Sequence, residues 1–265
     1  MRSMRLSILT ILAAAMAGSF ASAEQLKIGT EGAYPPWSMA DASGNVTGFD
    51  ADVGNLLCAK LNMTCEFVVQ AFDGLIPALK TNQFDIIISG MSISEERKKQ
   101  IDFSVGYAEV TSAFAAPEGS DLLSMTDVPT LLTAIDGLKV GVQSGTTNAR
   151  FIEARAPNVD LKTYDTLDQM LIDLASGRIE TAFADIAALQ SFLATPSGKT
   201  FQIVNVKFNS TVDPMIGSII GVGIAHGNTE LKAKVNQALC ELVADKSIGK
   251  SSEKWFLTDI SRPCE

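Results

Sequence analysis

The 265-residue sequence predicts an α/β protein made of two consecutive units in which strands alternate with helices. Three observations support this prediction. Short segments that are apolar throughout, or apolar at every second position, alternate with segments whose apolar residues recur at helical spacing. This alternation occurs twice, and a polar, turn-rich stretch at residues 117–129 lies between the two series. Such a pattern is typical of mainly parallel sheets with helices on both faces.

The first unit covers residues 26–89. Alternating apolar residues predict a strand at 26–30, and the run FDIIIS predicts a strand buried on both faces at 84–89. The remaining elements expected here are helices at 49–61 and 74–81 and a strand at 65–69.

The second unit begins near Leu138. We expect strands at 138–142, 159–164 and 179–184 and helices at 147–155 and 167–176. A glycine-rich stretch at 212–223, which we expect to lie outside the core, then leads to a strand at 219–225 and a helix at 230–244. The residue pattern alone allows this last pair to pack on either unit.

The first 23 residues have the pattern of an export signal. Two arginines precede an apolar run at 6–17, and the small residues Ala21 and Ala23 define a cleavage site. The alternative is a membrane anchor, but a run of about a dozen residues is shorter than the roughly 20 that span a bilayer. No cysteine follows Ala23 to carry a lipid, and no later run is long and apolar enough to span. We therefore expect cleavage after residue 23 and a freely soluble exported protein.

The chain is acidic, with a formal net charge of −9 at pH 7. Binding to a phosphate backbone needs a basic face, and no stripe of lysine and arginine occurs in the sequence. We therefore expect no nucleic-acid partner.

Four cysteines follow the signal, and an even number in an exported chain predicts disulfides. Three pairings are possible. We favour Cys58 with Cys65, which closes a short loop between helix and strand, and Cys240 with Cys264, which ties the C-terminal tail to the last long helix. Zinc is the alternative, but the chain has no CxxC pair and a single histidine, His226. We expect no metal site and no cofactor.

Aromatic residues follow two predicted strands of the first unit. Tyr34 and Trp37 surround two prolines directly after the first strand, and Phe72 follows the strand at 65–69. In open α/β sheets ligands bind at the carboxyl ends of strands. The rings therefore either flank a ligand or pack into the local core.

The segment SGMSISEER, residues 89–97, places Arg97 in the first turn of a short helix capped by Ser92 or Ser94. A helix dipole disfavours a cation at this end, so a bound anion explains Arg97 better than a surface ion pair. In the second unit, the turn VQSGTTNA offers free amides that suit a carboxylate, although such turns are also ordinary helix caps. Asp185 ends a predicted strand and is either a helix cap or the counter-charge of an ammonium group.

Several longer motifs resemble the bacterial extracellular solute-binding proteins for polar amino acids, in particular those for lysine/arginine/ornithine and for histidine. They are IGTEGAYPPW, GFDADVGNLLC with a second cysteine seven residues on, FDGLIPALK, FDIIISGMSISEERKKQIDFS, VGVQSGTTNA and DLASGRIETAFAD. The resemblance implies the two-lobed type II periplasmic binding protein fold, each lobe a central, mainly parallel sheet flanked by helices. It places residues 24–108 and 218–265 in the first lobe, residues 113–213 in the second, and two hinge crossings near 108–112 and 213–218.

The resemblance also implies roles for individual residues. Arg97 grips the α-carboxylate of an amino acid with the amides of Ser92 and Thr147, and Asp185 accepts the α-ammonium together with the Ser92 hydroxyl and the Gly90 carbonyl. Tyr34 and Phe72 flank the ligand side chain, and Glu31 receives its distal cation. The full set of ligand-binding residues implied is Glu31, Tyr34, Phe72, Ser89, Gly90, Ser92, Arg97, Gln143, Thr146, Thr147 and Asp185.

The function implied is that of the periplasmic substrate-binding component of an ABC transporter, which closes its hinge on arginine, ornithine, lysine or histidine. Its partners would be the amino acid and the transporter's membrane subunits, and we expect a monomer. Gly90, Gln143 and Asn148 depart from the basic-amino-acid binders, and TEGAYPPW and TYDTLD also resemble opine-binding relatives, so an opine is the alternative ligand. A cyclic-acid dehydratase of the same fold and a sensory ectodomain are less favoured, because His226 lies in a polar turn and no membrane span follows.

Overall fold

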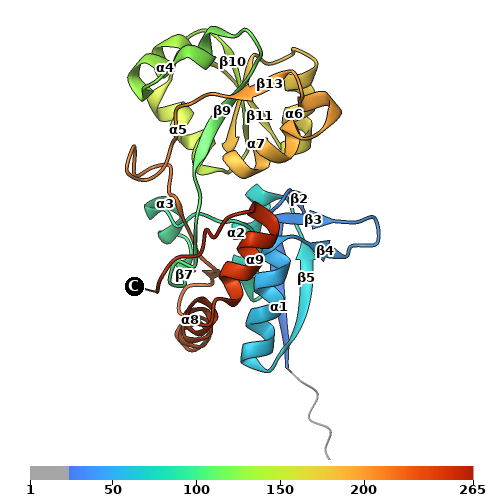
Figure 1. The fold of residues 1–265 in the computed structure, drawn as a ribbon. Coiled ribbons are helices and arrows are strands. Elements are labelled where there is room, and N and C mark those ends of the chain that lie inside the picture. The colour runs from blue at the N-terminus through green and yellow to red at the C-terminus, as the bar shows by residue number, and fades with distance from the viewer. Residues whose placement is uncertain (1–23, 265) are drawn as a thin grey trace, which may run out of the picture.

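The computed structural model describes residues 24–264, so the predicted export signal lies outside the described residues. The chain forms two α/β lobes, one above the other in Figure 1, and each lobe is built on a five-stranded sheet. We call the lobe that contains the N-terminal strand the first lobe and the other the second lobe.

The sheet of the first lobe has the order β5-β1-β6-β15-β7. Its strands are β1 (Gln25–Thr30), β5 (Thr64–Val69), β6 (Ile86–Ile87), β7 (Asp102–Phe103) and β15 (Gly223–Ile224). The first three are parallel, whereas β15 runs antiparallel to its neighbours. Helices α1 (Phe49–Leu61), α8 (Thr229–Ala244) and α9 (Ser247–Phe256) cover one face, and η1 (Phe72–Gly74) and α2 (Leu75–Lys80) cover the other.

The sheet of the second lobe repeats this plan with the order β11-β10-β12-β9-β13. Its strands are β9 (Ser112–Pro117), β10 (Lys139–Gln143), β11 (Asp160–Tyr164), β12 (Thr181–Asp185) and β13 (Phe201–Ile203). Helices α4 (Val128–Ala134) and α5 (Thr147–Arg155) pack on one face, and α6 (Leu167–Ala175) and α7 (Ile186–Leu193) on the other. In both lobes the parallel strands end at the edge that faces the other lobe (Figure 1).

Smaller elements complete the fold. They are the three-stranded sheet of β2 (Ala33–Tyr34), β3 (Ser38–Ala40) and β4 (Val46–Thr47), the helix α3 (Glu95–Lys98), the 3-10 helices η2 (Asp121–Ser124) and η3 (Pro196–Gly198), and the hinge pair β8 (Ala108–Glu109) and β14 (Ile219–Ile220).

The structure corrects two expectations about local structure. The single strand expected at 219–225 is two short strands in different sheets, because β14 pairs with the hinge strand β8 while β15 enters the first sheet. The stretch expected as a loop at 117–129 contains η2 and the start of α4. That helix begins where the Asp127 carboxylate accepts a hydrogen bond of 2.9 Å from the Thr130 amide. Its seven residues are too few to display a helical repeat.

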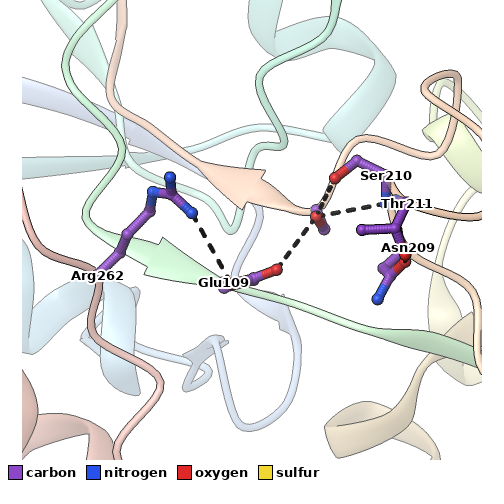
Figure 2. Close-up of polar contacts among 6 residues, drawn as sticks. Glu109, Asn209, Ser210, Thr211 and Arg262 are labelled. Atoms are coloured by element: carbon purple, nitrogen blue, oxygen red, sulfur yellow. Dashed lines mark hydrogen bonds and ion pairs between the residues drawn. The ribbon is translucent and has the colours of Figure 1, made fainter. Parts of the chain in front are cut away.

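Two segments cross between the lobes, and the C-terminal tail lies beside them. The Glu109 amide of β8 donates to the Ile260 carbonyl at 2.9 Å, and the Arg262 amide donates to the Tyr107 carbonyl at 3.0 Å. The side chains of Arg262 and Glu109 also face each other (Figure 2), with 3.9 Å between Nη1 and a carboxylate oxygen. The Ser218 hydroxyl of the return crossing donates to the other oxygen of the same carboxylate at 3.5 Å. The tail thus packs directly against β8, one of the two crossing segments.

Both favoured disulfides are present, Cys58–Cys65 between α1 and β5 and Cys240–Cys264 between α8 and the tail. The second disulfide anchors the tail directly after its contact with β8. Within residues 24–264, no helix combines the length and the apolar character needed to cross a bilayer.

Candidate ligand-binding site

The carboxyl ends of the parallel strands of both lobes surround one cavity. All eleven residues expected in the ligand site line it, together with Trp37 and Asn148. The space itself measures about 40 Å³, whereas small-molecule pockets hold roughly 300 Å³ or more. The two lobes therefore lie close together around this space.

Arg97 is the most deeply buried charge of this cavity, with 2% of the residue exposed. It belongs to α3, whose N-cap is Ser94 rather than Ser92: the Ser94 hydroxyl accepts from the Arg97 amide at 3.3 Å. Its Nη1 donates to the Ser92 carbonyl at 2.8 Å, and its Nη2 crosses to the Gly145 carbonyl of the second lobe at 3.1 Å. Burial and the neighbouring Arg150 lower the pKa of Arg97 to about 9, so it stays positive at neutral pH.

Asp185 faces Arg97 from the second lobe. It stands at the N-cap of α7, yet its side chain makes no capping hydrogen bond. The carboxylate instead accepts from the Ser112 hydroxyl at 3.2 Å. Burial raises its pKa to about 7, against the opposing effects of Ser112 and of the positive Arg97. Of the two roles open to Asp185, the structure thus excludes that of a side-chain helix cap.

Glu31 lines the cavity from the first lobe. It follows β1, is 5% exposed, and accepts a hydrogen bond of 2.5 Å from the Gln143 side chain of the second lobe. Burial raises the pKa of Glu31 to about 7, and the charges of Asp168, Asp73 and Asp185 add to this rise. The Glu31 carboxylate therefore favours a positively charged neighbour, which would offset both its burial and the nearby negative charges.

The aromatic residues divide between core and cavity. Trp37 is 2% exposed and packs on Phe49 and Phe256, with ring centroids 5.6 and 4.8 Å away, so it belongs to the core while one part of it lines the cavity. Gly90 has φ +52°, and a Cβ there would lie 3.1 Å from the Trp37 ring. Tyr34 lines the cavity and accepts from the Asp185 amide at 3.3 Å, a further contact between the lobes.

Three contributors were not among the eleven expected ligand-binding residues. Gly145 receives the Arg97 hydrogen bond through its carbonyl, and Ser112 holds Asp185. Asn148 shares the Ser112 hydroxyl through its side-chain oxygen at 3.1 Å. Gly145 could have been found from its position in the glycine turn before α5, whereas nothing local marks Ser112, which reaches the site from β9.

The remaining reactive groups lie elsewhere. His226 contacts Asp102, with 3.3 Å between Nδ1 and Oδ1, and is not among the residues that line the cavity. In the part of the chain from 24 to 264, no three histidine, cysteine, aspartate or glutamate side chains are grouped to hold a metal ion. The site offers one guanidinium, two carboxylates, hydroxyls and helix-start amides, a set that binds a charged small molecule.

The chain is similar to known solute-binding proteins in sequence and in fold. Residues 26–258 match the model of the bacterial extracellular solute-binding proteins, family 3. The lysine/arginine/ornithine-binding periplasmic protein of Escherichia coli is 36% identical over 255 residues, which cover 95% of each chain. An ancestral arginine-binding protein bound to arginine is 34% identical, with a TM-score of 0.79 over 89% of this chain and 99% of that one.

A third relative bears on the question of catalysis. It is an ancestral amino acid-binding protein described as a precursor of cyclohexadienyl dehydratase, 30% identical with a TM-score of 0.76 over 88% of this chain and 95% of that one. The family match spans most of the sequence, and the fold is that of the type II periplasmic binding proteins. The chain belongs to the bacterial extracellular solute-binding proteins of family 3.

Proposed function

We propose that the protein is the periplasmic substrate-binding component of an ABC transporter and captures a basic amino acid, with arginine as the first candidate and ornithine, lysine and histidine as the others. One observation carries this proposal. A cavity between the lobes holds a buried arginine and a carboxylate for the two charges of an amino acid, and the buried Glu31 as a second carboxylate.

Each charge of the ligand has a partner in this arrangement. Arg97 binds the α-carboxylate, because its planar fork of donors fits two oxygens at once, and the amides of Ser92 and Thr147 assist. Asp185 accepts the α-ammonium, while Tyr34 and Phe72 flank the side chain. Glu31 accepts the distal cation. Ser89, Gly90, Gln143 and Thr146 line the remaining walls.

Binding couples to closure because the charged groups come from different lobes. In the closed cleft, Arg97 donates to Gly145, Gln143 donates to Glu31, and the Asp185 amide donates to Tyr34. We expect the ligand to enter the open cleft, where its own groups replace these hydrogen bonds between the lobes. A ligand that lacks one of the two charges leaves a buried group unpaired and stabilises closure less.

The raised pKa of Glu31 determines the direction in which stability and ligand affinity change with pH. The folded protein holds this proton between the ordinary value of 4.5 and about 7, so the stabilisation from the bound proton is lost as the pH rises through this range. A cation beside Glu31 lowers that pKa. Affinity for a cationic ligand therefore rises with pH until about 7 and then levels off.

Catalysis is not part of the proposed function. Glu31 and Asp185 could exchange protons with a substrate, but an amino acid with a cationic side chain supplies a partner for both. No histidine lines the cavity among the described residues. We propose a monomer in the periplasm whose protein partners are the membrane subunits of its transporter.

A thermal-shift screen tests the proposal. A ligand that binds only the folded protein raises its melting temperature. The rise grows with the ratio of the ligand concentration to the dissociation constant. The panel contains arginine, ornithine, lysine, histidine, glutamine and an opine. We expect the largest shift from a basic amino acid and its loss in Asp185→Asn. A protein that responds to none of the amino acids, and instead turns over a cyclic acid, would contradict the proposal.

A further inference from the structure

A second cavity adjoins the proposed ligand site on the outer side of Arg97. It measures about 130 Å³ and shares Phe72 and Arg97 with the first cavity. From the first lobe it is lined by Gln100 and Asp73, and from the second lobe by Gly145 and Arg150. The contact between Arg97 and the Gly145 carbonyl, 3.1 Å long, separates the two spaces.

Arg150 brings a second positive charge to this cavity; its charge acts on the Glu96 carboxylate, which does not line the cavity. It lies in the first turn of α5, where the helix dipole disfavours a cation. Its Nη1 is buried and has no hydrogen-bond acceptor among the described residues. An unsatisfied buried donor on a charged group is unfavourable by roughly 1–3 kcal/mol or more. The buried Nη1 of Arg150 therefore lacks a hydrogen-bond acceptor.

The guanidinium of Arg97 adds to the excess of positive charge at this cavity. Arg97 and Arg150 are close enough for the charge of Arg150 to disfavour the charged form of Arg97. Across residues 24–264, neither arginine lies within 4.0 Å of a carboxylate oxygen. Asp73 lines the same cavity, but its side chain is exposed and pairs with neither of them. Two like charges that share a cavity attract an anion placed between them.

We propose that Arg97 and Arg150 form a subsite for a small monovalent anion that bridges the two lobes in the closed cleft. The anion is either a free ion of the size of chloride or a second carboxylate carried by the ligand. Because the two arginines come from different lobes, the subsite is complete only after closure. A bound anion therefore stabilises the closed form and raises the affinity of the neighbouring amino-acid site.

The test uses the full protein and compares Arg150→Gln with Arg178→Gln, which removes the same charge from a side chain that is 62% exposed and paired with Asp173. Arginine affinity is measured by calorimetry as chloride replaces gluconate at constant ionic strength. Gluconate is much larger than chloride and serves as the reference anion, so only the identity of the anion changes. A second series compares arginine with N-carboxymethyl-arginine in gluconate alone.

Each outcome decides between the sources of the anion or against the subsite. A gain of about fivefold or more in chloride that Arg150→Gln loses and Arg178→Gln keeps assigns a free ion. No chloride effect, with tighter binding of the carboxymethyl derivative that again requires Arg150, assigns a ligand carboxylate. Identical behaviour of wild type and Arg150→Gln in both series overturns the subsite.

This inference rests on the proposed function for its main measurement, and a separate one distinguishes the two failures. If no amino acid binds the wild type, the proposed function fails. The anion subsite is then tested alone by the chloride-dependent melting temperature of the free protein. A rise in the wild type that Arg150→Gln lacks supports the subsite, and equal curves overturn it.

Discussion

Replacing Gly145 by alanine tests whether closure of the lobes is needed for binding. Gly145 has φ +73°, and a Cβ added there would lie 2.9 Å from both Cα and Cβ of Asp73 in the first lobe. Real Cβ atoms do not approach backbone atoms this closely, so the lobes must shift apart by a few tenths of an ångström or more. The Gly145 carbonyl would then move away from Arg97.

Two effects of this change have to be separated. Alanine in a left-handed conformation is unfavourable by roughly 1–2 kcal/mol, and this strain acts in the open and the closed form alike. The overlap with Asp73 exists only in the closed form, where overpacking destabilises by about 1–3 kcal/mol. Strain lowers the free energy of unfolding, whereas the overlap lowers ligand affinity by about 5- to 150-fold.

Gly177 supplies the matched control. It has φ +72°, and a Cβ there has no described atom within 4 Å, so Gly177→Ala introduces the same backbone strain without the overlap. We expect both variants to melt a few degrees below the wild type in the absence of ligand. Titration calorimetry should show wild-type affinity in Gly177→Ala and much weaker binding in Gly145→Ala. Equal affinities in the two variants would refute the closure argument.

Three further predictions concern the charges and the hinge. Arg97→Lys should weaken binding about a hundredfold or more by calorimetry, because an ammonium cannot reproduce the planar fork; near-wild-type affinity would rule out the carboxylate site. Arginine affinity should rise with pH up to about 7, and Glu31→Gln should reduce this rise; glutamine affinity, whose rise depends on the Asp185 carboxyl alone, should be little changed by Glu31→Gln. The same loss for both ligands would remove Glu31 from cation recognition. Replacing both cysteines of Cys240–Cys264 by serine should lower the free energy of unfolding by about 2–4 kcal/mol and also weaken arginine binding, since the disulfide holds the tail on β8. Removal of the Cys58–Cys65 disulfide should affect the melting temperature alone, and equal effects on affinity would contradict this role of the tail.

Periodicity identified the elements that are long or regularly patterned. The helix expected at 230–244 is α8, and the strand expected at 26–30 lies within β1. The pattern did not identify β9, α7 or α9, and it merged into one strand two short strands that pair with partners distant in sequence. The residues of β14 pair with β8, more than a hundred positions earlier, and no pattern within 219–225 reveals where one strand ends and the next begins.

The candidate site was predictable where a residue follows a strand or starts a helix. Arg97 and Asp185 occupy such positions, whereas Glu31 was expected only from the resemblance to the basic-amino-acid binders; the structure brings all three to one cavity. Ser112 was not predictable, because its hydroxyl meets Asp185 only after β9 pairs antiparallel with β12. The same holds for Trp37, because whether its ring packs in the core or lines the cavity depends on the distant Phe256.

The sequence by itself determined the alternating strands and helices, the cysteine pairs to favour and the residue types that face a ligand, since these follow from local spacing and chemistry. Only the tertiary structure decided which groups meet across the cleft. The Glu31 pair with Gln143, the Arg97 contact with Gly145 and the proximity of Arg150 to Arg97 all join different lobes. Contacts of this kind depend on how two separately folded sheets approach each other, and local sequence patterns carry no information about that distance.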